Sequence, residues 1–326
     1  IYATLKFFLF TLVGSVLLLV AMVYIFLTTG VFDLTLLPQA GFTPTVQLWL
    51  FVACFAAFAV KIPMWPLHTW LPDAHVQAPT AGSVMLAGVL LKLGAYGFLR
   101  ICLPILPEAS VAAAPWVMGL SLVAILATAW IALRQQDMKK LIAYSSVSHM
   151  GFVTLGIFAL TTAGLQGAML QLINHGLVSA ALFMLVGNIY DRLHTRDLAK
   201  MGGIAAVMPR YGVLFLFFTM AAVALPGTNN FVGEFLVIVG SYPVAAWAVV
   251  PATLGVVFGA AYMLRLYRVA LLGQATQPAV LALTDLTPRE CWLFAPLVVL
   301  TLGLGLFPQP LLDLTAPVTA QLLEYI

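Results

Sequence analysis

The segment VKIPMWPLHTWLPDAH, residues 60–75, places a lysine and two prolines at the end of an apolar helix. The residues before it, 48–60, carry no charge, and Lys61 follows directly. Proline lacks a backbone N–H and ends or kinks a helix, so Pro63 and Pro66 break this one beside Lys61. In a bilayer, a broken backbone and an ammonium group persist only where protein or a water-filled cavity covers them. The segment therefore predicts a discontinuous membrane helix with a functional lysine at its break.

The rest of the chain has the composition of a membrane protein. Of its 326 residues, 63% are hydrophobic and 8% are charged, whereas soluble domains average about 25% charged residues. The cysteines Cys54, Cys102 and Cys291 show neither metal-ligand spacing nor a disulfide framework. No phosphate-binding loop, catalytic triad, flavin motif or haem motif is present. We therefore expect no cofactor, no metal, no nucleic-acid partner and no bond chemistry in this chain itself.

The apolar runs predict an all-α, polytopic transmembrane bundle. A helix needs about 20 apolar residues to cross the hydrocarbon core. We expect nine spans, at residues 4–28, 46–61, 80–101, 112–133, 141–161, 164–190, 211–240, 246–268 and 290–308. The span 211–240 contains LPGTNNFVGEF at residues 225–235, where proline and glycine predict a second break. Interrupted spans in corresponding places of two halves are typical of transporters with inverted repeats.

The basic residues give the orientation of the spans. If the chain has nine spans, the basic residues in the connections and near the N-terminus all lie on one side of the membrane. The positive-inside rule makes this side cytoplasmic. These residues are Lys6, Arg134, Lys139, Lys140, Arg192, Arg196, Lys200, Arg210, Arg265, Arg268 and Arg289. Arg100 alone lies at the other face. The C-terminus is therefore predicted on the outer side.

Lys92 is a basic residue near the middle of a predicted span, 80–101. A lysine at this depth costs roughly 2.5–3.5 kcal/mol on insertion scales, so its presence requires a reason. One hypothesis is that Lys92 carries protons. The alternative is a structural lysine paired with the carboxylate of a neighbouring helix.

Two histidines lie on polar stripes of otherwise apolar helices. His149 follows Ser145 by four residues, and His175 shares a face with Gln171 and Asn174. Histidine donates and accepts protons near neutrality, which suits a proton relay. The alternatives are packing residues or metal ligands, and no second ligand lies at the helical spacing that metal binding favours.

Carboxylates and histidines near the two breaks complete the candidate set. Glu234 follows the second break, either as a proton-carrying acid or as a cap for the freed helix end. Near the first break, His68, Asp73 and His75 are expected in a loop, where they line a proton inlet or make local hydrogen bonds.

Four stretches then show a resemblance to a known family. They are KIPMWPLHTWLPDAHVQAPTAGSVMLAGVLLKLGAYG, DMKKLIAYSSVSHMGF, INHGLVSAALFMLVGNIYDRLHTRDLAKMGG and LPGTNNFVGEF. They resemble the antiporter-like M-type subunits of bacterial respiratory complex I, whose mitochondrial counterpart is NADH dehydrogenase subunit 4. The resemblance covers nearly the whole chain. The wider family includes Mrp-type sodium/proton antiporter subunits and membrane-bound hydrogenase subunits.

The resemblance implies a fold and a set of site residues. Residues 1–103, with a broken helix at 46–66, would be the remainder of a first inverted repeat. Residues 104–273, with a broken helix at 211–240, would be the second, and 274–326 a C-terminal helix and tail. The proton-translocating residues would be Lys61, Lys92, His149, His175 and Glu234. A glutamate at 234 favours the M type over the L and N types, which carry a lysine there.

The same resemblance implies a function and an assembly. The chain would be a proton-translocating subunit of NADH:quinone oxidoreductase, driven by electron transfer in other subunits. It would lie in a bacterial inner membrane beside other membrane-arm subunits, including L-type and N-type ones, and membrane lipid. The alternatives are a stand-alone Mrp-type antiporter subunit, a membrane-bound hydrogenase subunit, or a structural scaffold with fixed ion pairs. The family has about fourteen spans, so we expect a truncated chain or a second polypeptide that supplies the glutamate partner of Lys61.

Overall fold

The computed structural model describes the whole chain, residues 1–326, and it is almost entirely helical. Its α-helices are α1 (Tyr2–Thr29), α2 (Pro44–Lys61), α3 (Trp70–Gln77), α4 (Thr80–Met85), α5 (Lys92–Gly97), α6 (Leu103–Ile105), α7 (Pro107–Arg134), α8 (Met138–Phe158), α9 (Thr162–Leu193), α10 (Ile204–Val207), α11 (Pro209–Ala222), α12 (Asn229–Ser241), α13 (Ala246–Leu271), α14 (Pro278–Leu281), α15 (Pro288–Leu306) and α16 (Gln309–Glu324). No β-strand is present beyond one isolated bridge between Asp137 and Asp197. The all-α prediction is confirmed.

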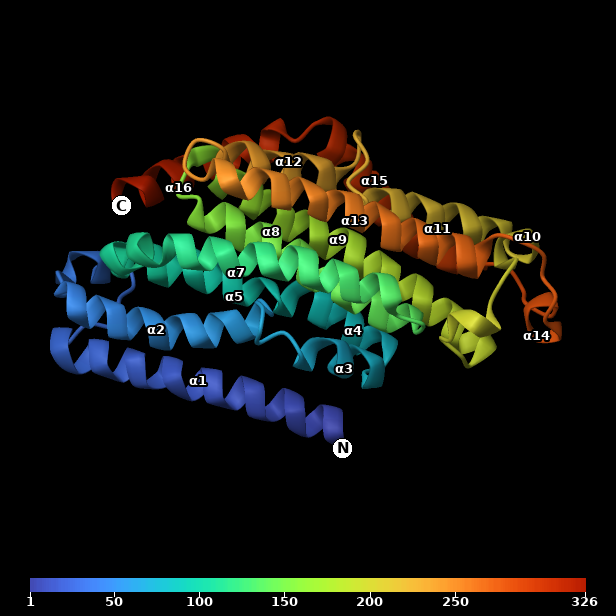
Figure 1. Cartoon of the computed structure of the whole chain (residues 1–326), viewed down its shortest axis with the longest axis horizontal. Helices are drawn as coiled ribbons and strands as arrows, with labels where there is room; N and C mark the ends of the chain where they lie inside the picture. Colours follow the sequence, from blue (N-terminus) through green and yellow to red (C-terminus); the bar gives the residue numbers. More distant parts are fainter.

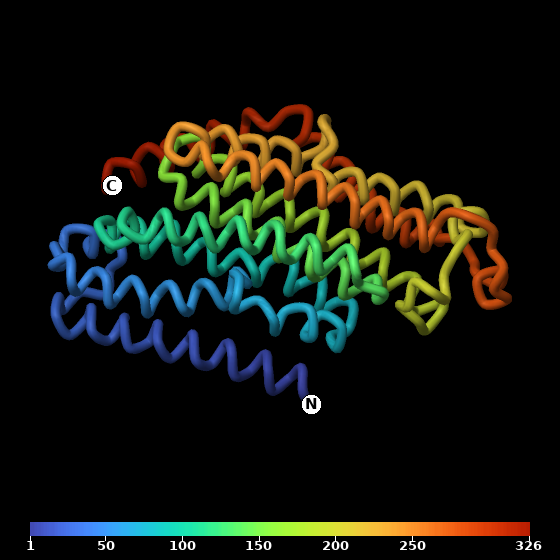
Figure 2. The backbone as a smooth tube through the Cα atoms, in the orientation of Figure 1, coloured from blue at the N-terminus to red at the C-terminus, as the bar shows by residue number.

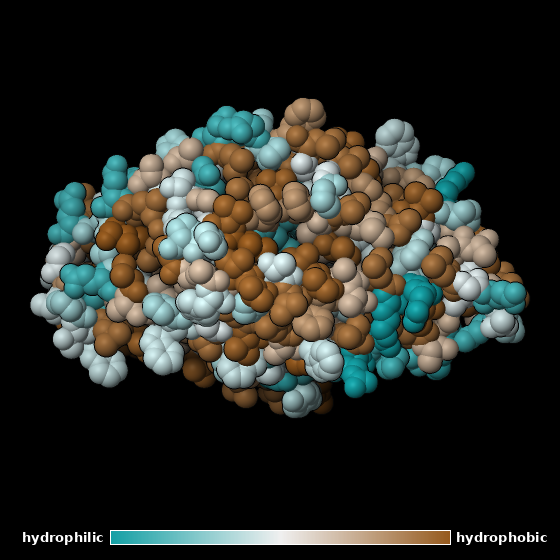
Figure 3. Space-filling model, turned by 45° about the horizontal axis from the view of Figure 1, so that its top comes forward, coloured by the Kyte–Doolittle hydropathy of each residue, from teal (hydrophilic) through white to brown (hydrophobic).

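The long helices lie side by side along one direction (Figure 1). Eight of them are long and apolar enough to cross a membrane. On the face drawn in Figure 3, apolar side chains cover most of the middle, and hydrophilic ones gather towards the ends. A surface of this kind suits a bilayer, because the hydrocarbon core accepts only an apolar surface. The protein is a multi-pass membrane protein.

The seventh predicted span, 211–240, consists of two short helices in sequence. α11 ends at Ala222, and α12 begins at Asn229, with Pro226 and Gly227 between them. Gly227 has a φ of 95°, a backbone conformation that glycine adopts without steric cost. The second break is therefore where the sequence predicted it.

The first discontinuous helix consists of α2 and α3, and one prediction about it was wrong. α2 ends at Lys61 as expected, but Asp73 and His75 lie on the helix α3 and not in a loop. Proline is tolerated in the first turn of a helix, where its missing N–H costs no hydrogen bond, so Pro72 does not prevent α3. In Figure 1 the α2–α3 pair runs from left to right and the α11–α12 pair from right to left.

The helix that carries Lys92 is continuous but irregular. Between Thr80 and Ile105 the backbone passes through π-helical turns at Leu86–Leu90 and Phe98–Cys102. The backbone trace in Figure 2 follows this segment without a break. π-helical turns inside α-helices occur frequently at functional sites.

α8 and α9 lie in the middle of the bundle. α8 packs against α7 on one side and α9 on the other, and α9 packs against α12. Within α8, 94% of the residues of its apolar window are buried, which marks it as the central helix. Polar side chains on these helices are therefore shielded from lipid.

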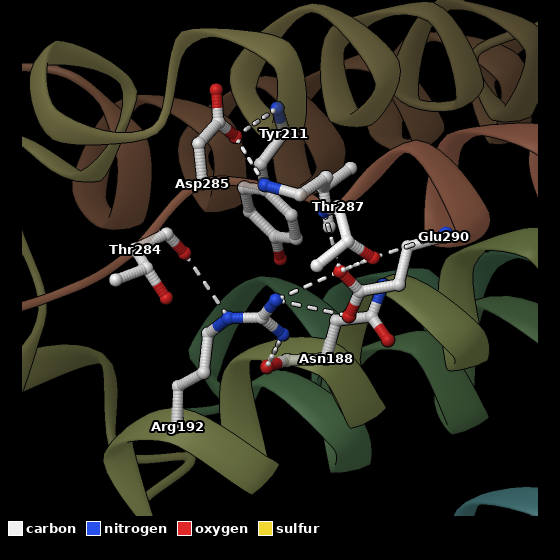
Figure 4. A network of polar contacts seen from close by, with 8 residues as sticks. Asn188, Arg192, Tyr211, Thr284, Asp285, Thr287 and Glu290 are labelled. Atoms are coloured by element: carbon white, nitrogen blue, oxygen red, sulfur yellow. Dashed lines mark hydrogen bonds and ion pairs between the residues drawn. The ribbon is translucent and has the colours of Figure 1, made fainter.

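A polar network joins the ends of α9, α11 and α15 at the face rich in basic residues (Figure 4). Arg192 of α9 donates two hydrogen bonds of 2.9 Å to the carboxylate of Glu290, which also belongs to the capping box of α15. The Asp285 carboxylate accepts the backbone N–H of Tyr211 at 3.1 Å, near the start of α11. Both bonds to Glu290 come from Nη2 of Arg192, and hydrogen bonds between charged groups are stronger than neutral ones. The network thereby holds the first half of the discontinuous α11–α12 helix against α9.

Candidate functional site: a buried line of titratable side chains

Lys92 and His175 form the first pair of the site. Lys92 opens α5, directly after the π-helical turn Leu86–Leu90, and its Nζ lies 2.8 Å from Nδ1 of His175 on α9. The ammonium also donates to the carbonyl of Ala87 within the π-helical turn. Both Lys92 and His175 lie near the middle of their membrane helices. The lysine therefore finds its partners at a depth where water is scarce.

His149 and Glu234 form the second pair. Nδ1 of His149 on α8 lies 2.6 Å from Oε1 of Glu234 on α12. Gln171 of α9 donates from Nε2 to the same oxygen at 3.0 Å. His149 is 6% exposed and Glu234 3% exposed. A buried carboxylate needs such donors, because burying an unpaired charge is costly.

The two pairs meet through their imidazole rings. The ring centroids of His149 and His175 are 5.8 Å apart, and Nε2 of each ring is buried without a hydrogen-bond partner. Lys92, His175, His149 and Glu234 therefore form one line across α5, α9, α8 and α12, interrupted at a single place. The structure brings together four of the five residues that the sequence predicted for proton transfer.

The geometry shows which partners Lys92 and Glu234 have. Lys92 bonds to an imidazole and a backbone carbonyl, and not to the carboxylate that the structural alternative required. Glu234 does not cap α12, because that helix begins at Asn229 and has no acidic residue in its first turn. Asn174 donates instead to the carbonyl of Asn229 at 2.7 Å, which ties α9 to the break.

Lys61 lies apart from this line. It is the last residue of α2, directly at the first break, and its side chain is half-buried. No ion pair joins it to another residue of this chain. Its position at the break agrees with the sequence, while its role in proton transfer stays a prediction.

The three residues near the first break have three different environments. Asp73 forms an ion pair of 2.8 Å with Lys6. His75 is fully buried, stacks on the ring of Phe183 with centroids 4.4 Å apart, and has no partner for either ring nitrogen. His68 is buried, with Nδ1 unpartnered. Asp73 thus has an ion-pair partner, whereas His75 has no hydrogen-bond partner and His68 has none at Nδ1.

Sequence reasoning missed several polar residues around the site. Tyr262 of α13 is almost fully buried. Lys139 and Arg196, which the sequence places in connections between spans, donate to the carbonyls of Ala78 (2.7 Å) and Val76 (2.6 Å) at the end of α3. A tyrosine on an apolar helix is common, so the sequence offers little reason to select Tyr262. The bonds from Lys139 and Arg196 to the end of α3 join residues far apart in the sequence, so the sequence alone could not pair them.

A cavity of about 860 Å³ adjoins Lys92. Mostly apolar side chains line it, from the helix 80–105, from α9 and from α16, and Lys92 and Arg100 are its two basic lining residues. No three His, Cys, Asp or Glu side chains come close enough together to hold a metal ion. The polar chemistry of the site is therefore that of lysine, imidazole, amide and carboxyl groups.

These features define a class of protein: a polytopic membrane protein with two discontinuous helices and a buried line of titratable groups. Residues 1–259 match the family model described as "NADH:quinone oxidoreductase/Mrp antiporter, TM". The chain belongs to this family.

Relatives with curated names place the chain more narrowly within the family. It is 52% identical to NADH-quinone oxidoreductase subunit M of Rhodobacter capsulatus, over 99% of this chain and 66% of the relative. It is 47% identical to NADH-ubiquinone oxidoreductase chain 4 of Chondrus crispus, over 100% of this chain and 66% of the relative. The chain thus spans slightly less than two thirds of the length of these relatives.

Solved structures share the fold. A chain of respiratory complex I from Thermus thermophilus with bound NADH matches with a TM-score of 0.92 and 33% identity, over 99% of this chain and 69% of that one. A chain of the Mrp complex from Dietzia sp. DQ12-45-1b matches with a TM-score of 0.89 and 23% identity, over 99% and 68%. The second likeness concerns the fold alone.

Proposed function

We propose that this chain is the antiporter-like M subunit of a proton-pumping NADH:quinone oxidoreductase. It moves protons within the membrane, and electron transfer in other subunits supplies the driving force. The chain carries no redox centre and catalyses no bond chemistry itself. The relatives at 47–52% identity support the subunit type, and the buried line supports the activity.

The observation that carries the proposal is the line Lys92–His175–His149–Glu234. Contacts of 2.8 Å and 2.6 Å join the members of each pair, and 5.8 Å separates the two imidazole centroids. Lysine, imidazole and carboxyl groups all exchange protons, and desolvation brings buried lysines and carboxylates towards neutral forms. Nε2 of each imidazole has no hydrogen-bond partner within the chain, so each is able to bond a water molecule. Protons reach this line from Lys61 and leave from Glu234.

The assembly follows from the same proposal. The chain lies in a bacterial inner membrane among other membrane-arm subunits, including L-type and N-type antiporter-like ones. Residues 1–103 and 104–273 form inverted repeats, which the opposite directions of the two discontinuous helices support (Figure 1). The end of the bundle with Arg192, Arg196 and Lys139 faces the cytoplasm, in accordance with the positive-inside rule.

The second candidate is an antiporter subunit that exchanges sodium for protons without an electron donor. The fold shared with the Mrp complex is compatible with it, but that likeness is at 23% identity. Lys92, His175 and Glu234 would serve both functions. The two are distinguished by whether proton movement requires NADH oxidation.

The test is proton pumping by the assembled complex in inverted membrane vesicles that carry Lys92→Ala. NADH-to-ferricyanide activity serves as the assembly control, because it needs no proton transfer through the membrane arm. We expect this activity to persist while pumping and coupled quinone reduction fall at least about tenfold, the effect of removing one proton-transferring group.

Two other results would count against the proposal. Unchanged pumping per electron would make Lys92 structural and this route wrong. Proton flux that depends on sodium and persists without NADH would favour the antiporter instead.

A further inference from the structure

The Glu234 carboxylate receives two hydrogen bonds on one oxygen, and only one of the donors belongs to the proton line. His149 approaches Oε1 at 2.6 Å and Gln171 at 3.0 Å. Gln171 is fully buried on α9, so its amide has no access to bulk water. A buried amide in contact with a proton-carrying acid affects which states of that acid are stable.

The carbonyl oxygen of the same Gln171 amide, Oε1, is buried and has no hydrogen-bond partner. A primary amide carries two N–H donors and one carbonyl acceptor, and rotation about its last torsion exchanges their positions. Ionised Glu234 needs donors, whereas protonated Glu234 has an O–H to donate. The Gln171 amide satisfies the first state as it stands and the second after it turns.

The backbone of α12 leaves room for this amide. Gly233 directly precedes Glu234, and a methyl group added there would lie 3.1 Å from Cα of Gln171 and 2.5 Å from its Oε1. One turn earlier on α9, a methyl group on Gly167 would lie 2.7 Å from the backbone nitrogen of Val237. These glycines let α9 and α12 approach closely enough for the amide to reach the acid.

We infer that Gln171 is a positioning residue that holds Glu234 in both of its protonation states by turning its amide. Resting on the function proposed above, the inference adds a step to it. When His149 passes its proton to Glu234, the new O–H turns to the Gln171 carbonyl. His149 is left as a neutral imidazole with its remaining proton on Nε2 and its Nδ1 unprotonated. The proton on Glu234 is retained because its bond now points to an amide and not back to the imidazole.

The test replaces the amide by an apolar side chain of similar length, Gln171→Met, in the assembled complex. Gln274→Met, at an exposed position, is the matched control. Redox-induced infrared difference spectra report the C=O stretch of protonated Glu234, identified as the band that disappears in Glu234→Gln. In Gln171→Met we expect this band to move to higher frequency, because the acid loses a hydrogen-bond partner. We also expect protons pumped per electron to fall at least about threefold.

A merely structural role for Gln171 predicts a different result. The Glu234 band would then stay in place in Gln171→Met and pumping would match the control, which would overturn the inference. If Glu234→Gln itself pumped normally, the proposed route would fail, a separate outcome.

Should Gln171→Met not assemble, Gln171→Asn tests the same point. It keeps an amide but withdraws it from Glu234 by about one bond length. The band is expected to move in the same direction, and an unmoved band would again overturn the inference.

Discussion

At the scale of single residues, the site depends on which neighbour each charged group has. Lys92 bonds to His175 and Glu234 bonds to His149, so each pair contains one imidazole. The sequence identified all four residues, because charges and histidines in apolar helices are rare enough to require an explanation. It could not pair them, since Lys92 and His175 are 83 positions apart and Glu234 and His149 are 85 apart. Only the packing of α8 and α9 against their neighbours determines the pairs.

A first prediction concerns His175. In His175→Leu the Lys92 ammonium loses its side-chain partner and the line loses its middle member. We expect pumping per electron to fall at least about tenfold, while NADH-to-ferricyanide activity persists. The measurement is proton uptake by inverted vesicles, compared with His194→Asn. His194 follows α9 in the left-handed conformation, at φ 52°, which asparagine accepts. Equal pumping by both variants would remove His175 from the line.

At the scale of elements, the breaks and close helix contacts position the site. The prolines, glycines and charges near Lys61 and Glu234 predicted both breaks in the sequence. α3 was missed because Pro72 and the polar residues around it suggested a loop, while the structure accepts proline in the first turn. The close contact between α9 and α12 was not predictable, because nothing in the sequence shows which glycines face another backbone.

A second prediction uses two glycines on helices. A methyl group on Gly240 of α12 would lie 2.7 Å from Cα of Gly164, a backbone atom that cannot move alone. Gly119 of α7 has no atom within 4 Å of the same position. We expect Gly240→Ala to destabilise the packing of α12 by about 1–3 kcal/mol. Gly119→Ala should instead stabilise its helix by about 0.5–1 kcal/mol.

The half-life of quinone-reductase activity in heated membranes measures this difference. Gly240→Ala should inactivate faster than wild type, and Gly119→Ala no faster. Equal half-lives for the two variants would mean that the contact between α12 and α9 does not limit stability.

At the scale of the whole molecule, the bundle has one end rich in basic residues and one nearly free of them. The sequence predicted this division, because the positive-inside rule needs only the order of spans and charges. It did not predict that part of these charges bind helix ends. Arg196 and Lys139 donate to backbone carbonyls at the end of α3, and Arg192 of α9 donates to the carbonyl of Thr284 in the connection before α15.

A third prediction tests the orientation. In a background with Cys291→Ser, single cysteines are introduced at the exposed positions Gln274 and Gln39, in connections at opposite ends of the bundle. Cys54 and Cys102 are fully buried, so we expect them not to react with the maleimide. A membrane-impermeant maleimide added to inverted vesicles should label Gln274→Cys and not Gln39→Cys. Right-side-out spheroplasts should give the reverse, and the opposite pattern would invert the proposed topology.

The common depth of the buried line has an electrical consequence. Lys92, His149 and His175 each lie near the middle of a membrane helix, so a proton that passes among them moves along the plane of the membrane. The membrane potential does work only on charge displaced across the bilayer, about 2.3 kcal/mol per charge per 100 mV for a full crossing. The lateral step is therefore nearly insensitive to voltage. If the line carries protons as proposed, we expect the protonmotive force to oppose uptake and release, and the central relay to run at the same rate in energised and de-energised membranes.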